Sequence, residues 1–205
     1  MKTNINIIGL GFVGLTTALG FASKKNKIIC VEKNPSRLNS IKKGKVPFKE
    51  PDLEKVLKKT KKNFCIFSEK PIILKGAVNI VFICVGTPCK SNGAVNLDQI
   101  NKTIISIKNN HKNERIIFVI KSTVPPGTIK ENLKNFKNRN ISFCSNPEFL
   151  REGFAWYDFN NTDKIVIGYE RYEDFKILKK IYNKFKGDII GVNTNTSEFI
   201  KYLSN

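Results

Sequence analysis

The amino-acid sequence predicts an α/β fold with a doubly wound, mostly parallel sheet, ending in the first turns of a further helix. Short apolar runs alternate along the chain with amphipathic helical patterns, as they do in βαβ units. The apolar runs are continuous, which is typical of parallel strands covered by helices on both faces. A glycine-rich turn also joins the first run to the first helical pattern, as in Rossmann-like domains.

The expected strands and helices alternate over most of the chain. The runs expected to be strands are INIIG (5–9), KIICV (27–31), FCIF (64–67), NIVFICV (79–85), IIFVI (116–120), ISFC (141–144) and KIVIG (164–168). The helical patterns cover 14–25, 35–44, 51–60, 96–109, 127–137 and 171–186. The helix over 35–44 has a proline in its first turn and stops at Gly44, as helices commonly do.

A last helix is expected near the C-terminal end of the sequence. Asn195, with Glu198 three residues later, predicts a capping box, and apolar residues recur after it at helical spacing. We expect this helix to begin near Gly191. Residues 1–190 would then form the sheet domain, and residues 191–205 would start a separate helix.

The first turn carries a dinucleotide-binding pattern. Gly9, Gly11 and Gly14 form G-x-G-x-x-G between an apolar strand and a helix. In this motif the first glycine permits a tight turn, the second lets the backbone approach a pyrophosphate, and the third allows close packing of helix on strand. The helix N-terminus then offers amide donors and partial positive charge to the phosphates.

An acidic residue closes the second predicted strand. Glu32 is placed to accept hydrogen bonds from the adenosine ribose hydroxyls, and its charge disfavours a 2′-phosphate. The sequence therefore predicts NAD rather than NADP as cofactor, although Lys33 and Arg37 are close enough to bind a phosphate.

The chain is strongly basic, with 36 Lys and Arg against 17 Asp and Glu, a formal charge of +19. The lysines occur in pairs throughout the sequence and no nucleic-acid-binding motif accompanies them, so we expect no nucleic-acid partner. An anionic nucleotide would gain from the same field.

The cysteines and the N-terminal apolar run favour a cytoplasmic protein with no membrane contact. Five cysteines without a C-x-x-C pair indicate reduced thiols, and Cys89 alone lies in a polar loop. The uncharged run from Thr3 to Ser23 is interrupted by polar residues and glycines, which fits strand, turn and helix better than a membrane span. No metal site is predicted.

Three later segments lie at the carboxyl ends of predicted strands, where open α/β sheets bind ligands. They are VGTP (85–88), KSTVPPGT (121–128) and NPEFLREG (146–153). Together with GLGFVGL (9–15) and EKNPSR (32–37), they resemble the nucleotide-sugar dehydrogenase family, which includes enzymes of UDP-glucose and GDP-mannose. The resemblance extends from Ile5 to Asn205.

The resemblance implies NAD-dependent oxidation of the C6 alcohol of a nucleotide sugar, through the aldehyde to the acid. NPEFLREG favours UDP-glucose as the substrate, and leaves GDP-mannose and UDP-N-acetylhexosamines as alternatives.

The resemblance also assigns cofactor roles to individual residues. The pyrophosphate turn would be Gly11, Phe12 and Val13, and the ribose contacts would be Glu32 and Arg37. The nicotinamide side would contain Thr87, Ser122 and Thr123, with Thr123 near the reacting carbon, and Glu152 would lie near NAD.

The substrate roles fall on two later segments. The sugar-facing set would be Glu148, Phe149, Leu150, Arg151, Glu152, Lys201 and Asn205. Within it, Glu148 would work with water during acyl hydrolysis. Lys201 and Asn205 would stabilise developing oxyanions, which gives Thr123, Glu148, Lys201 and Asn205 as the catalytic set.

In the family, a cysteine of a second, UDP-binding domain is the nucleophile, and a central helix forms the dimer contact. None of the five cysteines here matches that position, and we expect the second domain and most of the dimer helix to be absent. The 205 residues would then bind NAD without completing the oxidation. Two other interpretations stay open: a stand-alone NAD-binding regulatory module, and a basic nucleic-acid binder.

Overall fold

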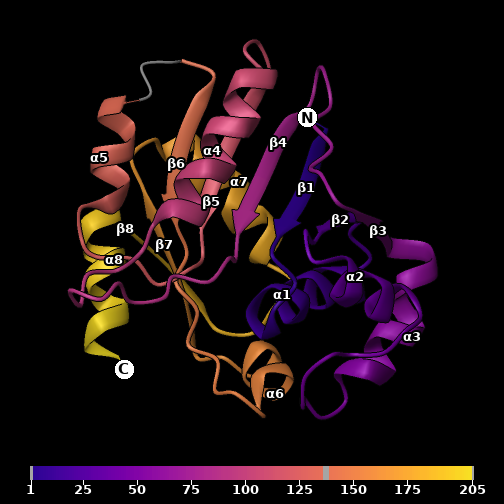
Figure 1. Cartoon of the computed structure of the whole chain (residues 1–205). Helices are drawn as coiled ribbons and strands as arrows, with labels where there is room; N and C mark the ends of the chain where they lie inside the picture. The colour runs from indigo at the N-terminus through magenta and orange to yellow at the C-terminus, as the bar shows by residue number, and fades with distance from the viewer. Residues whose placement is uncertain (1, 136–138, 205) are drawn as a thin grey trace.

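An eight-stranded sheet forms the centre of the fold, and helices lie on both of its faces (Figure 1). The computed structural model describes residues 2–135 and 139–204. The strands are β1 (Thr3–Ile8), β2 (Ile28–Val31), β3 (Cys65–Ser68), β4 (Val78–Ile83), β5 (Arg115–Ile120), β6 (Ile141–Ser145), β7 (Lys164–Tyr169) and β8 (Asp188–Val192). The helices are α1 (Phe12–Ser23), α2 (Pro35–Lys42), α3 (Leu53–Phe64), α4 (Asp98–Asn110), α5 (Thr128–Asn135), α6 (Ala155–Asn160), α7 (Tyr172–Tyr182) and α8 (Thr194–Leu203).

The strand order is β3-β2-β1-β4-β5-β6-β7-β8. All neighbouring pairs are parallel except β6 and β7, which confirms the predicted mostly parallel sheet. The chain leaves β1 toward β2 on one side and later returns to β4 on the other, so the order reverses between β1 and β4. In open α/β sheets, ligands bind at the carboxyl ends of the strands beside such a switch point.

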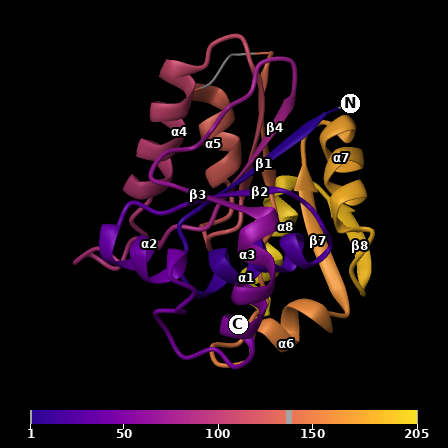
Figure 2. The same cartoon turned by 90° about the vertical axis from the view of Figure 1, so that its right-hand side faces the viewer.

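Both faces of the sheet are buried, which explains the continuous apolar strands. Ile5 and Ile7 of β1 face a core formed with α1, α3, α6 and α7, while Ile8 faces a second core formed with α4 and α5. Figure 2 shows α4 and α5 on one side of β1 and β4, and α7 on the other.

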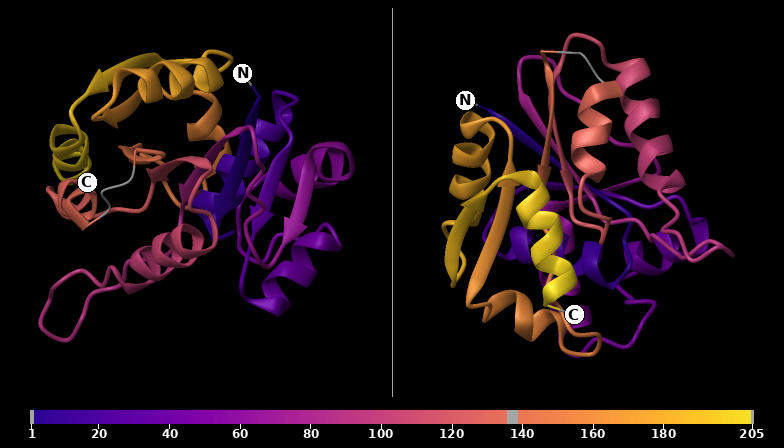
Figure 3. Two further views of the ribbon diagram at one scale, coloured as in Figure 1. Left: turned by 90° about the horizontal axis from the view of Figure 1, so that it is seen from above. Right: turned by 90° about the vertical axis from the view of Figure 1, so that its left-hand side faces the viewer.

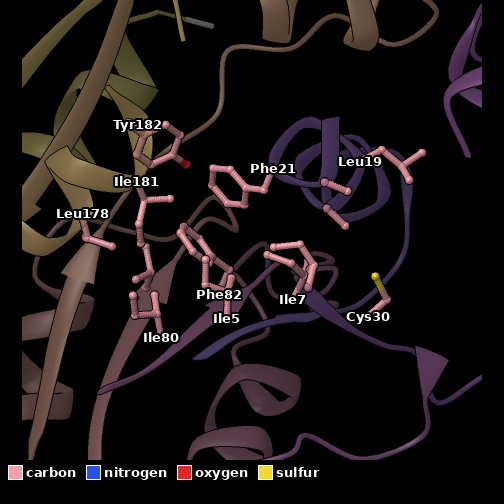
Figure 4. Close-up of a cluster of buried hydrophobic side chains, with 14 of the residues drawn as sticks. Ile5, Ile7, Leu19, Phe21, Cys30, Ile80, Phe82, Leu178, Ile181 and Tyr182 are labelled. Carbon is pink, nitrogen blue, oxygen red and sulfur yellow. The ribbon is translucent and has the colours of Figure 1, made fainter. Parts of the chain in front are cut away.

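Aromatic rings join α1 to the sheet and to α7. The ring of Phe21 in α1 lies 5.3 Å from that of Phe82 in β4 and 5.2 Å from that of Tyr182 in α7, measured between centroids. Figure 4 shows Phe21 beside both of these side chains. This cluster places α1 against β4, so that the N-terminus of α1 is fixed at the switch point.

The sequence did not predict two elements. The segment over 188–192 forms strand β8 beside β7, so Gly191 lies in a strand and the last helix starts only at Thr194. The six-residue helix α6 was also missed. As seen from above in Figure 3, the orange-to-yellow C-terminal elements lie across the molecule from α2 and α3.

The predicted capping box of the last helix is wrong. Asn193 is the N-cap of α8, and its side chain accepts a hydrogen bond from Thr196 N at 2.8 Å. Glu198 turns away from its own helix and accepts hydrogen bonds from Gly127 N at 2.7 Å and Ile129 N at 2.9 Å. It therefore caps α5, which lies beside α8 (Figure 1).

The first helix begins at Phe12 rather than at Gly14, because Gly11 is extended and serves as its N-cap.

Across the residues that the structure describes, none of the helices has the length and apolar character required to cross a bilayer. All five cysteines are free, and Cys89 is exposed, as the sequence predicted.

Candidate cofactor and substrate site

A cavity of about 580 Å³ lies at the carboxyl ends of β1, β2, β4 and β5, beside the switch point. Its lining contains most of the predicted cofactor residues, together with one predicted catalytic carboxylate. The lining residues are Ile8, Gly9, Gly11, Phe12, Val13, Glu32, Lys33, Arg37, Cys84, Val85, Gly86, Thr87, Gln99, Lys102, Thr103, Lys121, Ser122, Thr123 and Glu148.

The glycine turn forms one wall of the cavity. Gly9 has φ +88°, and a Cβ there would lie 2.9 Å from the Cys84 carbonyl oxygen. A Cβ on Gly14 would lie 1.8 Å from the Gly9 oxygen, so only glycine allows α1 to pack this closely. At Gly11 a Cβ would meet nothing within 4 Å and would occupy open space at the cavity wall.

The N-terminus of α1 opens toward this space. The N-cap is Gly11, no side chain caps the helix, and its first turn contains no acidic residue. The first amides of a helix have no intrahelical partner, so they are available to a bound anion. The uncapped helix end and the bare Gly11 wall fit the pyrophosphate of a dinucleotide.

Glu32 lies at the second strand's end, as predicted, and is 6% exposed. Its Oε2 accepts a hydrogen bond from Leu10 N at 3.0 Å, and its Oε1 accepts one from Asn34 N at 2.9 Å. Arg37 Nη1 lies 3.4 Å from Oε2. The carboxylate therefore supports the turn that it shares with the cavity, and it keeps capacity to accept from ribose hydroxyls.

Residues that the sequence predicts for the nicotinamide side hold two loops together. Ser122 Oγ donates to the Val85 carbonyl at 2.7 Å, and Thr87 Oγ1 donates to the Thr123 carbonyl at 2.9 Å. The loops that follow β4 and β5 are thereby joined across the cavity.

Glu148 and Lys201, both predicted to face the substrate, form an ion pair. Their side chains are nearly buried, with Lys201 Nζ 3.2 Å from Glu148 Oε1. Glu148 Oε2 accepts a hydrogen bond from Leu150 N at 2.6 Å. Lys201 Nζ also lies 5.7 Å from the centroid of the Phe149 ring. Residues 50 or more apart in the sequence thus form one ion pair beside the cofactor cavity.

Two neighbouring residues, Ser197 and Glu198, hold helix α8 at the carboxyl end of the sheet. Ser197 Oγ lies 3.0 Å from Ser145 Oγ, at the end of β6, and Glu198 caps α5. Burial raises the pKa of the Glu198 carboxyl, and the bonds from Ile129 N and Gly127 N oppose that shift. These contacts place Lys201, one turn further along, against Glu148.

Two of the predicted substrate residues, Arg151 and Glu152, do not line the cavity. Arg151 forms a two-point ion pair with Asp158 of α6, and its side chain is exposed. Glu152 is also exposed and does not line the cavity. Asn205 lies outside the described residues. Phe149 and Leu150 line a smaller adjoining cavity of about 50 Å³, with Glu148 between the two spaces.

Sequence reasoning missed several lining residues. Gln99 and Lys102 lie three apart on α4 and thus on one helical face. Lys121 directly follows β5, where the rule that ligands bind at strand ends could have identified it. It is 5% exposed, and burial lowers the pKa of its ammonium group.

Cys84 also lines the cavity, but burial raises the pKa of its thiol to about 12. It is therefore protonated near neutral pH and unsuited to nucleophilic attack. No cluster of three or more potential metal ligands was found in the portion of the chain that the structure describes.

The cavity carries more positive than negative charge. Lys33, Arg37, Lys102 and Lys121 line it, against Glu32 and Glu148. This balance suits an anionic ligand that spans the space from the glycine turn to Thr123. The arrangement can hold a dinucleotide with its reactive end near a carboxylate and a lysine.

Comparison with known proteins relates this chain to nucleotide-sugar dehydrogenases. Residues 3–186 match the profile described as the UDP-glucose/GDP-mannose dehydrogenase family, NAD binding domain. A UDP-glucose 6-dehydrogenase of Bacillus subtilis is 36% identical over 98% of this chain and 47% of its own length.

Solved structures share the fold. A UDP-glucose dehydrogenase of Pyrobaculum islandicum has a TM-score of 0.89 and 30% identity, over all of this chain and 49% of its own. A ternary complex of GDP-mannose dehydrogenase from Pseudomonas aeruginosa has a TM-score of 0.84 and 31% identity, over 99% and 49%. The chain thus spans about half the length of these relatives.

Proposed function

Because the chain belongs to the UDP-glucose/GDP-mannose dehydrogenase family and contains its NAD-binding domain, we propose that it supplies the cofactor side of an NAD-dependent nucleotide-sugar 6-dehydrogenase. One observation carries this proposal. A single cavity joins the glycine turn and Glu32 to Thr123 and Glu148, and Glu148 is paired with Lys201.

The cofactor would lie along this cavity. The amides after Gly11 would hold the pyrophosphate, Glu32 and Arg37 the adenosine ribose, and Ser122 and Thr123 the nicotinamide side. Bound NAD supplies a hydride acceptor for a substrate carbon. The loop contacts of Ser122 and Thr87 keep this end of the cavity fixed before ligand arrives.

The substrate side follows from the Glu148–Lys201 pair. The ammonium of Lys201 would stabilise negative charge that develops on the substrate oxygen, because a charge in a nearly buried site is weakly screened by water. The Glu148 carboxylate would orient water for hydrolysis of an acyl intermediate, and its bond from Leu150 N fixes one of its two oxygens. Asn205 and Arg151 remain proposed sugar contacts.

UDP-glucose is the proposed substrate of the complete activity. The NPEFLREG segment and the relatives that carry the UDP-glucose name support it. GDP-mannose is the second candidate, because the similar Pseudomonas enzyme is named for that sugar.

The test is NADH formation by the natural polypeptide that carries these residues. It would be supplied with NAD and, in turn, with UDP-glucose, GDP-mannose and UDP-N-acetylglucosamine. We expect UDP-glucose to give the highest kcat/KM, with two NADH formed per sugar. Preference for another nucleotide sugar would refute the substrate assignment, and no NADH with any of them would refute the dehydrogenase function.

For the 205-residue chain itself we propose NAD binding without complete oxidation. The described cysteines include none suited to act as the thiol nucleophile beside Glu148, since Cys84 is held protonated. Steady formation of UDP-glucuronate by this chain would contradict that proposal. If none of the nucleotide sugars changed the affinity of the chain for NAD, that result would instead favour a stand-alone cofactor-binding module.

We also propose the compartment in which the protein acts and the contact that its last helix makes. Free cysteines suit a reducing cytoplasm, and the exposed Phe199 and Leu203 on α8 suit a helix that contacts a second subunit. Helix α8, which starts at Thr194 after strand β8, would then begin the helix that links the NAD-binding domain to a UDP-binding part of the enzyme.

A further inference from the structure

A buried lysine stands between the cofactor and substrate sides of the cavity. Lys121 is 5% exposed and follows β5 directly, next to Ser122 and Thr123. None of the salt bridges among the described residues includes it. Burying an ammonium group without a paired carboxylate reduces stability, so its presence at a cavity wall requires an explanation.

The ammonium is bonded to Asn146. Lys121 Nζ donates to Asn146 Oδ1 at 3.1 Å and lies 3.4 Å from the Asn146 carbonyl oxygen. Tyr182 OH donates to the same Oδ1 at 2.6 Å, and Asn146 Nδ2 donates to the Val166 carbonyl at 2.8 Å. Both ends of the Asn146 amide are thereby fixed by Lys121, which follows β5, Tyr182 of α7 and Val166 of β7.

Asn146 in turn begins the loop that carries Glu148. Only Pro147 separates them, and proline fixes its own φ, so the orientation of Asn146 is passed on to the carboxylate. Lys121 is held on its other side by the hydrogen bond from its backbone N to the Ile83 carbonyl at 3.0 Å. The lysine thus connects the loop of Thr123 to the loop of Glu148.

We propose that Lys121 is a positioning residue: through Asn146 it fixes Glu148 relative to Thr123, at the expense of stability. This role rests on the proposed dehydrogenase function. It extends that function, because the residue acts on the carboxylate and not on the cofactor phosphates. Consistently, burial lowers the pKa of Lys121, while nearby Cys84 and Glu148 raise it and Lys201 lowers it.

The first test is Lys121→Met in the natural polypeptide that carries these residues. Methionine fills a similar volume without charge, so Tm should be equal to or above that of the wild type. NAD affinity should stay within threefold, and kcat for NADH formation should fall at least tenfold with little change in the KM of the nucleotide sugar. Such a pattern identifies a contribution made in the transition state.

The matched control is Lys130→Met, which makes the same change at an exposed position of α5 and should leave kcat and Tm unchanged. A second variant, Tyr182→Phe, removes the other donor to Asn146 without altering a buried charge. Its kcat should fall threefold or more while NAD affinity is kept.

Full kcat in Lys121→Met, a change confined to KM, or a large loss of Tm would overturn the positioning role and leave the dehydrogenase function standing. Unchanged kcat in Tyr182→Phe would exclude Asn146 as the connection. Absence of NADH formation by the wild type would overturn the function, and this role with it.

Discussion

Gly11 and Gly14 belong to one turn, but an added methyl group would meet different surroundings at the two positions. At Gly11 it would enter open cavity space, and at Gly14 it would collide with the Gly9 carbonyl at 1.8 Å. Only the second position is required by the fold.

Gly11→Ala should therefore lose NAD affinity by tenfold or more while its Tm changes by less than about 2 °C. Gly14→Ala, the matched comparison, should lose about 1–3 kcal/mol of unfolding free energy through overpacking. Calorimetric titration and thermal unfolding measure the two effects. Tight NAD binding by Gly11→Ala would contradict the placement of the pyrophosphate.

Single residues also show how far sequence reasoning reached. Glycine spacing and the position of Glu32 were sufficient to predict that these residues lie together at one edge of the sheet, where they line the cavity, because both follow from local chain geometry. The Arg151 side chain could not be placed in the same way, since its partner Asp158 depends on a short helix that the sequence did not predict. The bond from Lys121 to Asn146 joins the segments that follow the neighbouring strands β5 and β6, and it has no local signal in the sequence.

Helix α8 has its cap two residues before the predicted one. Asn193→Ala should cost about 1 kcal/mol of unfolding free energy, because Thr196 N loses its acceptor. Asn195→Ala should cost nothing measurable, since alanine is the better helix former at an exposed helical position. Denaturant unfolding of the two variants distinguishes the two candidate caps. A larger loss of unfolding free energy in Asn195→Ala than in Asn193→Ala would support the capping box instead.

The contact between α8 and α5 should be pH-dependent. Desolvation raises the pKa of Glu198 above its ordinary value of 4.5. The folded state then holds this proton more tightly than the unfolded state, so the associated stability is present below pH 4.5 and is lost as pH rises through the folded pKa.

The stability of the wild type relative to Glu198→Gln should consequently fall as pH rises from about 4 to 7. Equilibrium unfolding at several pH values gives this difference, with Asn195→Ala as a non-titrating control. A difference that grows with pH would show that the two amide bonds dominate over burial.

The missed elements have physical reasons. Strand β8 begins with Asp188 and contains Gly191, and it lies at the sheet edge, so it lacks the apolar run of a central strand. Helix α6 has only six residues, which is too short for a helical period to appear. The central strands were predictable because both of their faces are buried.

For the whole molecule, the sequence indicated the class of fold and the ligand edge, but not the pairing of strands. The reversal between β1 and β4 and the antiparallel β6–β7 pair depend on contacts between distant segments. The basic residues behind the net charge of +19 are likewise spread along the sequence. In the fold, four cationic side chains line one cavity together with two carboxylates. Ligand preference therefore follows from the cavity.

The most direct test of the central claim, an NAD site built from the glycine turn and Glu32, is calorimetric titration of the 205-residue chain with NAD and with NADP. The carboxylate of Glu32 at the ribose position should exclude a 2′-phosphate. We predict one NAD bound per chain, with NADP at least tenfold weaker. No heat with NAD, or equal affinity for the two cofactors, would contradict the account.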